Sequence, residues 1–185
     1  SGLIGMAIWF TSTSISPVIT PWETRTKTLE RLVSSPISHA GILLGDVISS
    51  ALIGIIMTFV PLGISLIFLD LTIVNPIALF AGIILASFSF SSIGVLMAAL
   101  PTDTPADVMM LSTLVKFPII FISGIFIPIS ELPGWGKIVS HISPLTYFTD
   151  LTRHSFGEGS AFWPTPIYDI IILSLFFLIF ITLAV

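Results

Sequence analysis

The chain contains no cysteine and few charged residues. Lys, Arg, Asp and Glu make up 9% of its 185 residues, whereas a soluble domain carries about 25%. Without cysteine, the chain forms neither disulfides nor thiolate metal sites. So few charges do not cover a globular surface with groups that bind water, and 55% of the residues are hydrophobic. The mean hydropathy of +1.11 therefore predicts a surface that faces lipid.

Sequence signatures of catalysis are also missing. The chain has no glycine-rich loop of the kind that holds ATP phosphates, no evident Ser-His-Asp arrangement and no His cluster with metal spacing. Its basic residues are too few for nucleic acid. His154 and Glu158, four residues apart, fit a solvated pair on one helix better than a metal site. We therefore expect no enzyme, cofactor site or metal site on this chain, and any energy source on another polypeptide.

Apolar segments long enough to cross a bilayer core of about 30 Å recur along the chain. We predict an all-α polytopic membrane protein that forms a single domain over residues 1–185. The chain begins and ends inside apolar runs, so we expect it to be part of a longer membrane protein. The five expected spans are about residues 2–19, 38–69, 77–100, 106–127 and 167–185.

A separate helix is predicted directly after the first span, over about residues 21–34. Thr20 is a suitable N-cap, Pro21 suits the first helical position, and Glu23 can reach back to the free backbone N–H groups. The helix should stop before Pro36, because the residue before a proline avoids helical geometry.

This predicted helix is polar on one side and apolar on the other. It holds three of the six basic residues of the chain, Arg25, Lys27 and Arg31. Leu29 and Leu32 fall on one side, which would need a partner protein or the membrane interface. The alternative is a plain connector whose charges are solvated.

The distribution of basic residues predicts the orientation in the membrane. Loop 20–37 has three basic residues, and loop 128–166 has two in about twice the length. Short loops rich in Lys and Arg stay in the cytoplasm. We therefore place 20–37 and 101–107 in the cytoplasm, and 70–76 and 128–166 outside.

Two charged residues interrupt the expected spans. Asp46 follows Pro36 by ten residues and Lys116 follows Pro105 by eleven, which is about 16 Å along a helix at 1.5 Å per residue. Isolated charges at that depth are costly and usually pair. We hypothesise an Asp46–Lys116 ion pair inside the bundle. The alternative is that Lys116 snorkels and Asp46 lies near the water boundary.

Small residues and a proline indicate how two spans pack and end. Gly41, Gly45 and Ser49 are spaced by four and allow close backbone approach on one helix face. We favour packing within the chain over contact with a second copy. Gly124 and Pro128 should end the fourth span and lead into a re-entrant segment.

Two ordered blocks of sequence stand out along the chain. The first block is Glu23, T-L-E-R-L-V at 28–33, S-P-I-S at 35–38 and L-L-G at 43–45. The second is F-I-S-G-I-F-I-P at 121–128, Leu132-Pro133, S-P-L-T-Y-F at 143–148, Asp150 and Arg153. Together the two blocks resemble the ABC-2 type permease family, and the resemblance covers essentially the whole chain. Asp46 departs from the pattern, since a basic residue more often follows the glycine at position 45 in the family.

The resemblance implies the membrane subunit of a daunorubicin-resistance-like exporter with six spans, of which the first is missing here. The polar helix would be a cytoplasmic coupling helix that docks on a separate ATP-binding subunit, and that subunit would carry ATP and Mg²⁺. The residues then expected to couple are Glu23, Arg25, Lys27, Leu29, Glu30, Arg31 and Leu32. Re-entrant helices in the outer leaflet would contain the gating residues Gly124, Pro128, Pro133, Pro144, Tyr147 and Arg153.

The expected function is ATP-driven export across the plasma membrane by a permease that pairs with a second copy, as a homodimer. The spans are rich in Ser, Thr and Phe and poor in charge, which fits a hydrophobic drug, a lipid or a lipid-linked glycan. One alternative is an ATP-independent secondary transporter or channel, although neither ion sites nor inverted repeats are evident. Another is a membrane assembly subunit that transports nothing.

Overall fold

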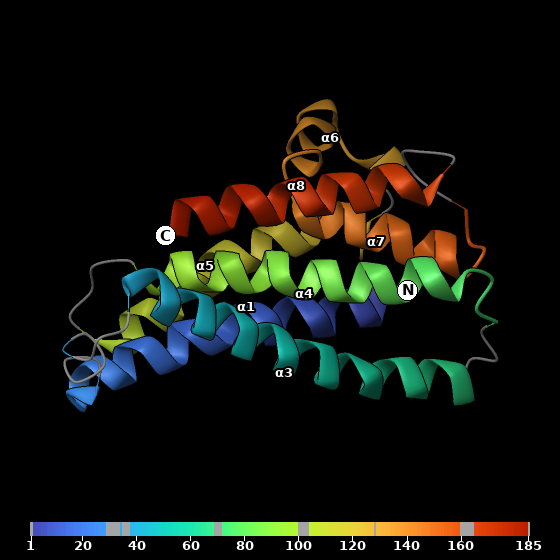
Figure 1. The fold of residues 1–185 in the computed structure, drawn as a ribbon. Coiled ribbons are helices and arrows are strands. Elements are labelled where there is room, and N and C mark those ends of the chain that lie inside the picture. The colour runs from blue at the N-terminus through green and yellow to red at the C-terminus, as the bar shows by residue number, and fades with distance from the viewer. Residues whose placement is uncertain are drawn as a thin grey trace.

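The computed structural model describes residues 2–28, 34, 38–68, 72–99, 104–127, 129–159 and 165–184. Within these ranges the regular structure is entirely helical, which confirms the all-α prediction. The long helices run side by side, α7 lies along them, and α6 projects from the bundle (Figure 1). The elements are α1 Gly2–Arg25, α3 His39–Phe68, α4 Pro76–Ala98, α5 Pro105–Ile122, the 3₁₀ turn η1 Ile129–Glu131, α6 Gly134–Ser140, α7 Pro144–Ser155 and α8 Pro166–Ala184.

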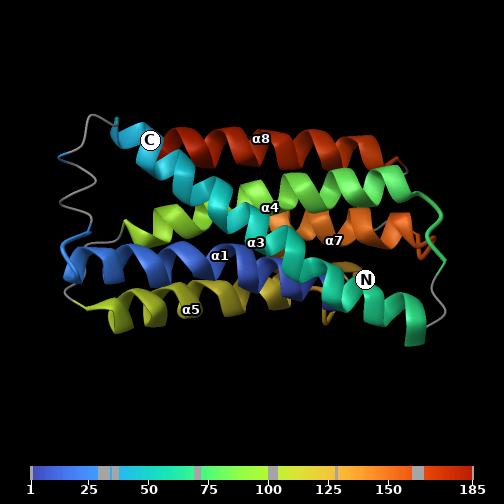
Figure 2. The same cartoon turned by 60° about the horizontal axis from the view of Figure 1, so that its bottom comes forward.

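Four of the described helices, α1, α3, α4 and α8, are long and apolar enough to cross a membrane. They correspond to four of the five expected spans. The other expected span, 106–127, coincides with the shorter helix α5, which ends at Ile122 and packs along α1 (Figure 2). The structure thus supports a multi-pass membrane protein, and the crossing by α5 stays a prediction.

Helix α4 lies at the centre of the bundle and packs against α1, α3, α7 and α8. It begins where the Asn75 side chain accepts a hydrogen bond from the backbone N–H of Ala78, at 3.3 Å, with Pro76 at the first position. The Phe90 ring meets Trp9 of α1 edge-on at 4.9 Å and Phe148 of α7 at 6.1 Å. This aromatic cluster therefore joins three helices at the core.

Helix α1 continues without a break from Gly2 to Arg25, so the prediction of a new helix beginning at Thr20-Pro21 is wrong. The Thr20 side chain does not cap a helix but donates to Asp46 Oδ2, at 3.4 Å. A proline costs about 3 kcal/mol inside a soluble helix, whereas membrane helices tolerate it because neighbouring helices and hydroxyl side chains satisfy the freed backbone groups. The capping pattern at Thr20-Pro21 would begin a new helix in a soluble protein. Within this bundle the same residues belong to one continuous helix.

The closest approach of α1 and α4 depends on Gly94. A Cβ atom at this position would lie 3.1 Å from the carbonyl oxygen of Thr13 and 3.2 Å from its Cα. These are backbone atoms of α1, which cannot rotate away as a side chain can. The bundle centre therefore requires a residue without a side chain at position 94.

We expect Gly94→Val to destabilise the protein by about 1–3 kcal/mol, because the added carbons separate α1 from α4. The control is Gly63→Val on α3, where a Cβ would have nothing within 4 Å. Thermal unfolding of the purified full-length protein in detergent measures both. Equal unfolding temperatures for the two variants would contradict the tight contact at Gly94.

Candidate functional site

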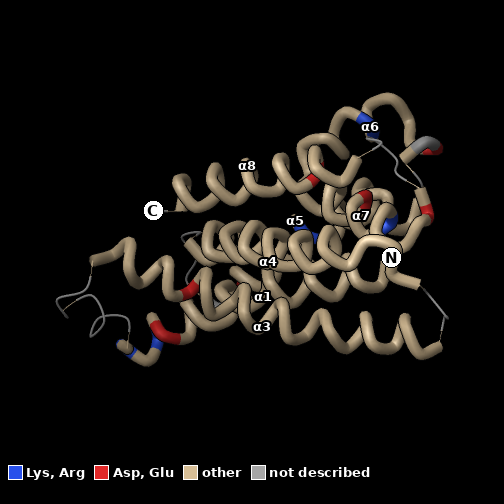
Figure 3. Tube along the Cα trace, turned by 45° about the vertical axis from the view of Figure 1, so that its right-hand side comes forward, with Lys and Arg blue, Asp and Glu red and all other residues tan. Residues whose placement is uncertain are grey.

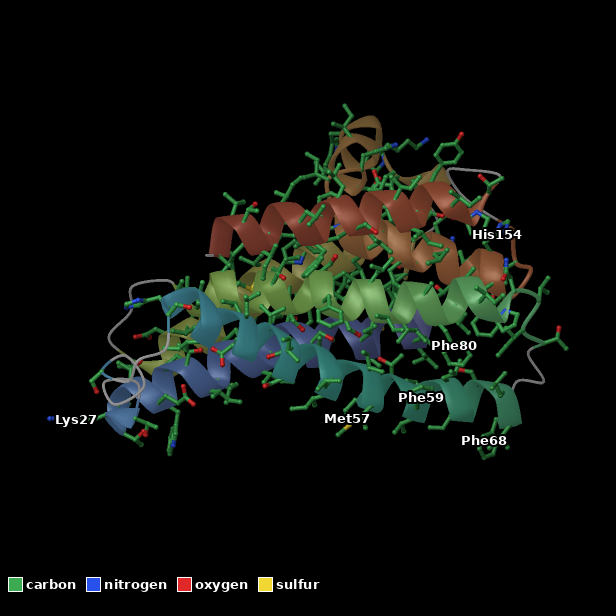
Figure 4. All side chains as sticks on the ribbon, viewed as in Figure 1. Lys27, Met57, Phe59, Phe68, Phe80 and His154 are labelled. Carbon is green, nitrogen blue, oxygen red and sulfur yellow. The ribbon has the colours of Figure 1, made fainter. Side chains whose placement is uncertain are left out.

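Charged residues gather at the two ends of the bundle, with long uncharged stretches of helix between them (Figure 3). Lys27 lies at one end and His154 at the other (Figure 4). Arg25 and Lys27 are exposed, and Glu23 is partly buried at the same end. Lys27 has a φ of 58°, a left-handed conformation that suits the chain just beyond the end of α1. The other expected coupling residues, Leu29, Glu30, Arg31 and Leu32, lie outside the described residues.

The structure gives Asp46 and Lys116 different partners, so the hypothesis that they form an ion pair is wrong. Lys116 is 3% exposed, and its Nζ donates to Ser14 Oγ on α1, at 2.9 Å. Asp46 accepts from Thr20, also on α1. Both α3 and α5 pack on α1, and each polar residue meets the face of α1 nearest to it. Similar depth alone does not bring two side chains together.

The turn after α5 is fixed to α7 by a partly buried polar contact. Gly124 has a φ of 82°, which favours glycine, and its carbonyl oxygen accepts a hydrogen bond from Arg153 Nη2 at 2.5 Å. A Cβ at Gly124 would lie 2.9 Å from Ile129 Cγ1. The structure thus brings together two predicted gating residues that are 29 positions apart.

The remaining predicted gating residues surround α6 and α7. Pro133 is the N-cap of α6, and Pro144 occupies the first turn of α7. The Tyr147 hydroxyl donates to the carbonyl oxygen of His141, at 2.8 Å, and so fixes the α6–α7 turn. Pro128 lies outside the described residues. These contacts shape a short helical element at the end of the bundle opposite Lys27.

Other expectations of the sequence are corrected by the same geometry. Gly45 has nothing within 4 Å of a built Cβ, and Gly41 and Ser49 are exposed, so this face does not pack against the part of the chain that the structure describes. Helix α7 ends at Ser155, so the expected pair of His154 with Glu158 on one helix is wrong. In the described part of the chain, no three His, Asp or Glu side chains gather to hold a metal ion.

The sequence analysis missed an apolar groove between α1 and α3. It has a volume of about 520 Å³. Met57 and Phe68 of α3 point away from the bundle (Figure 4), so this side of α3 is apolar well beyond the groove. No motif marks such a groove, because it depends on how the two helices cross. Its lining residues are Phe10, Thr11, Ser14, Ile15, Val18, Ile19, Ile53 and Met57.

Two buried carboxyl groups were also missed. Asp150 on α7 and Asp169 on α8 are each 1% exposed. The only sequence signal was the place of Asp169 just inside an otherwise uncharged span.

The family model for ABC-2 type transporters matches residues 1–156. The chain belongs to the ABC-2 type transporter family. It is 26% identical over 134 residues to the inner membrane transport permease YadH of Escherichia coli K12, covering 70% of this chain and 50% of that protein. It is 24% identical over 135 residues to the probable multidrug ABC transporter permease YbhR of the same organism, covering 72% of this chain and 36% of that protein. No solved structure gives a significant match.

This ABC-2 chain therefore spans half or less of the length of the two relatives that it matches. The family and the apolar helices together place it in the plasma membrane as a multi-pass protein. The matched residues end just after α7, so α8 lies beyond them.

We expect Arg153→Met to weaken the attachment of α7 to the turn after α5, because the Gly124 carbonyl loses a charged donor. Such a hydrogen bond contributes about 1.5–3 kcal/mol. Thermal unfolding of the full-length permease measures the loss, with the neighbouring variant His154→Gln as control. The assignment fails if both variants unfold at the same temperature as the unmodified protein.

Proposed function

We propose that this chain is the membrane-spanning subunit of an ATP-driven exporter, energised by a separate ATP-binding subunit. The observation that carries the proposal is the exposed basic end of α1, at Arg25 and Lys27, in an ABC-2 chain without a phosphate-binding loop. Exposed charge of this kind suits a surface that docks on a partner protein. If this segment were only a solvated connector, it would not need to continue a membrane-spanning helix without a break. Because α1 is unbroken, a movement of its Arg25 end would be transmitted directly to the helices that pack on it.

The proposed cargo is a hydrophobic or lipid-like molecule. The groove between α1 and α3 supports this, because the lining that it exposes is apolar and includes Phe10, Ile15 and Met57. Its volume of about 520 Å³ is in the range of pockets that hold small ligands. The name of YbhR, which describes that protein as a multidrug transporter, is consistent with a cargo of this class.

A second permease copy completes the transport path in this proposal, since one small bundle encloses little space. The face of α3 around Gly45 supports such a contact because it is open toward the described residues of the single chain and a glycine there permits close approach of a second helix. On this interpretation the small residues at 41, 45 and 49 serve contact between copies.

The coupling proposal is tested by reversing both charges, Arg25→Glu with Lys27→Glu, in the full-length permease. We expect co-purification of an ATP-binding subunit from native membranes to fall at least about tenfold, because like charges opposed across an interface cost several kcal/mol. The control is Lys137→Glu, an exposed position on α6 at the other end. Unchanged co-purification of the double variant, with Lys137→Glu also unchanged, would refute docking at the end of α1.

The second copy is tested by a single cysteine at Gly45 in a full-length protein free of other cysteines. We expect oxidation in the membrane to give a covalent dimer, because a disulfide forms only when two Cα atoms lie within about 7 Å. The matched position is Leu178→Cys on α8, which is also exposed. Cross-linking through position 178 but not 45 would place the dimer contact elsewhere.

A further inference from the structure

Lys116 is a buried cation that forms one hydrogen bond within the described part of the chain. It lies on α5 with 3% of its surface exposed. Its Nζ donates to Ser14 Oγ at 2.9 Å, and no described carboxylate pairs with it. An ammonium group has three donors, and a neutral hydroxyl offsets none of its charge. A charge buried without a counter-ion is costly inside a membrane protein and usually marks a functional site.

The helices that pack on α5 bring no acidic side chain to Lys116. These helices are α1, α4, α6 and α7. Neither α4 nor α6 contains an acidic residue, and the one acid of α1, Glu23, lies near the end of that helix. Asp150 of α7 forms neither a hydrogen bond nor an ion pair with Lys116. Asp107, on α5 itself, accepts a hydrogen bond from Thr104 at the start of the helix.

The apolar groove between α1 and α3 lies next to this cation. Ser14, which accepts the hydrogen bond from Lys116, is one of the residues that line the groove. Phe10, about one turn earlier on α1, also lines it, and the Phe10 ring meets that of Phe117 edge-on at 5.9 Å. Two successive residues of α5 thus contact the α1 wall of the groove. An apolar surface and a buried positive charge are therefore neighbours.

We propose that the groove binds an amphiphile with a single carboxylate, and that Lys116 recognises its negative charge. This proposal rests on the cargo site proposed above and names the chemical class of the cargo. The apolar body of the molecule would lie along Ile15 and Met57, which line the groove. Its carboxylate would replace Ser14 Oγ as the acceptor for Lys116, and the Ser14 hydroxyl would donate to the same carboxylate.

This exchange of acceptors agrees with the chemistry of the two side chains. In this structure the Ser14 hydroxyl holds the ammonium group behind the α1 wall. The flexible four-carbon stem of lysine lets the ammonium group follow a new acceptor. A hydrogen bond between two charged groups is about twice as strong as one between neutral groups. Binding of a carboxylate therefore gives Lys116 the counter-ion that the described residues do not supply.

The charge at the groove favours one negative charge on the ligand. Lys116 is a single cation, and a dianion such as a phosphate monoester would keep one charge uncompensated inside the bundle. None of the other described basic residues lines the groove. These residues are Arg25, Lys27, Lys137 and Arg153.

The depth of Lys116 distinguishes cargo from a surrounding lipid. Lys116 follows Pro105 by eleven residues, which is about 16 Å along α5 at 1.5 Å per residue. This is near the middle of a hydrocarbon core of about 30 Å. The headgroups of ordinary bilayer lipids stay at the surface of that core. An anion recognised at this depth is therefore a molecule on its way through the protein.

Competition against a photoreactive fatty acid tests the proposal in the full-length permease, purified into lipid nanodiscs. Palmitic acid, kept ionised at mildly alkaline pH, is compared with cetyl alcohol, which has the same chain length. We expect labelling at the groove and at least about tenfold stronger competition by the acid, because only the acid compensates the charge of Lys116. In Lys116→Met, which keeps an apolar stem, the two should compete equally. Lys116→Arg keeps the charge and should keep the preference.

The matched control is Lys137→Met, which removes an exposed charge on α6 and should leave the preference unchanged. If Lys116→Met does not fold, Met57→Trp fills the groove and should abolish the labelling there. Equal competition by acid and alcohol in the unmodified protein would overturn the proposal. So would a preference that survives in Lys116→Met, labelling that survives in Met57→Trp, or stronger competition by a dianionic alkyl phosphate.

ATP hydrolysis by the complex of the permease with an ATP-binding subunit separates this proposal from that of an exporter. Equal stimulation by palmitic acid and cetyl alcohol would leave the exporter proposal standing and overturn recognition by Lys116. Preferential binding of palmitic acid through Lys116 without stimulation would support the binding site and contradict the exporter proposal.

Discussion

The close packing of α4 against α1 is the contact on which the rest of the bundle depends. In lipid there is little hydrophobic force between helices, so association relies on close approach and on van der Waals contact. Gly94 lets the two backbones meet, and the Trp9–Phe90 contact fills the space beside them. Helices α3, α7 and α8 then pack on α4, and α5 packs on α1. Every other element is positioned relative to this central pair.

Hydroxyl side chains explain how so apolar a chain tolerates polar residues and prolines. Thr11, Thr58 and Ser174 each donate to the carbonyl oxygen four residues earlier in the same helix. A hydroxyl satisfied within its own helix needs no partner from another. A charged side chain cannot be satisfied within its own helix in this way. Lys116 therefore bonds to Ser14 of a neighbouring helix, whereas the Asp169 carboxylate oxygens have no hydrogen-bond partner among the described residues.

The long helices could be predicted from the sequence because their signal is length and hydrophobicity, which the bilayer fixes. Helices α4 and α5 both begin where a capping side chain, Asn75 or Thr104, is followed by a proline. The same pattern at Thr20-Pro21 misled, because local sequence does not reveal that a neighbouring helix holds the chain helical there. In a membrane protein, an N-capping residue followed by proline therefore indicates a helix start only where the preceding residues form a loop outside the helix bundle.

The polar pairs could not be predicted, because a pair depends on which helices are neighbours. Asp46 and Lys116 each form a hydrogen bond with a hydroxyl group of α1, so matching their depths gave the wrong partner. Arg153 and Gly124 were both identified by resemblance, but the resemblance did not show that one binds the other.

The unbroken α1 changes how the proposed coupling would act. A push at Arg25 would be transmitted along the axis of this one helix. Along that axis, Ser14 meets Lys116 of α5, and a Cβ atom at Gly5 would lie 3.4 Å from Ile125 Cδ1 in the turn that follows α5. Arg153 carries the connection from that turn to α7, which packs on α8. The two ends of the bundle are thus joined by a series of direct contacts, so a movement of the Arg25 end of α1 would reach α7 and α8 through them.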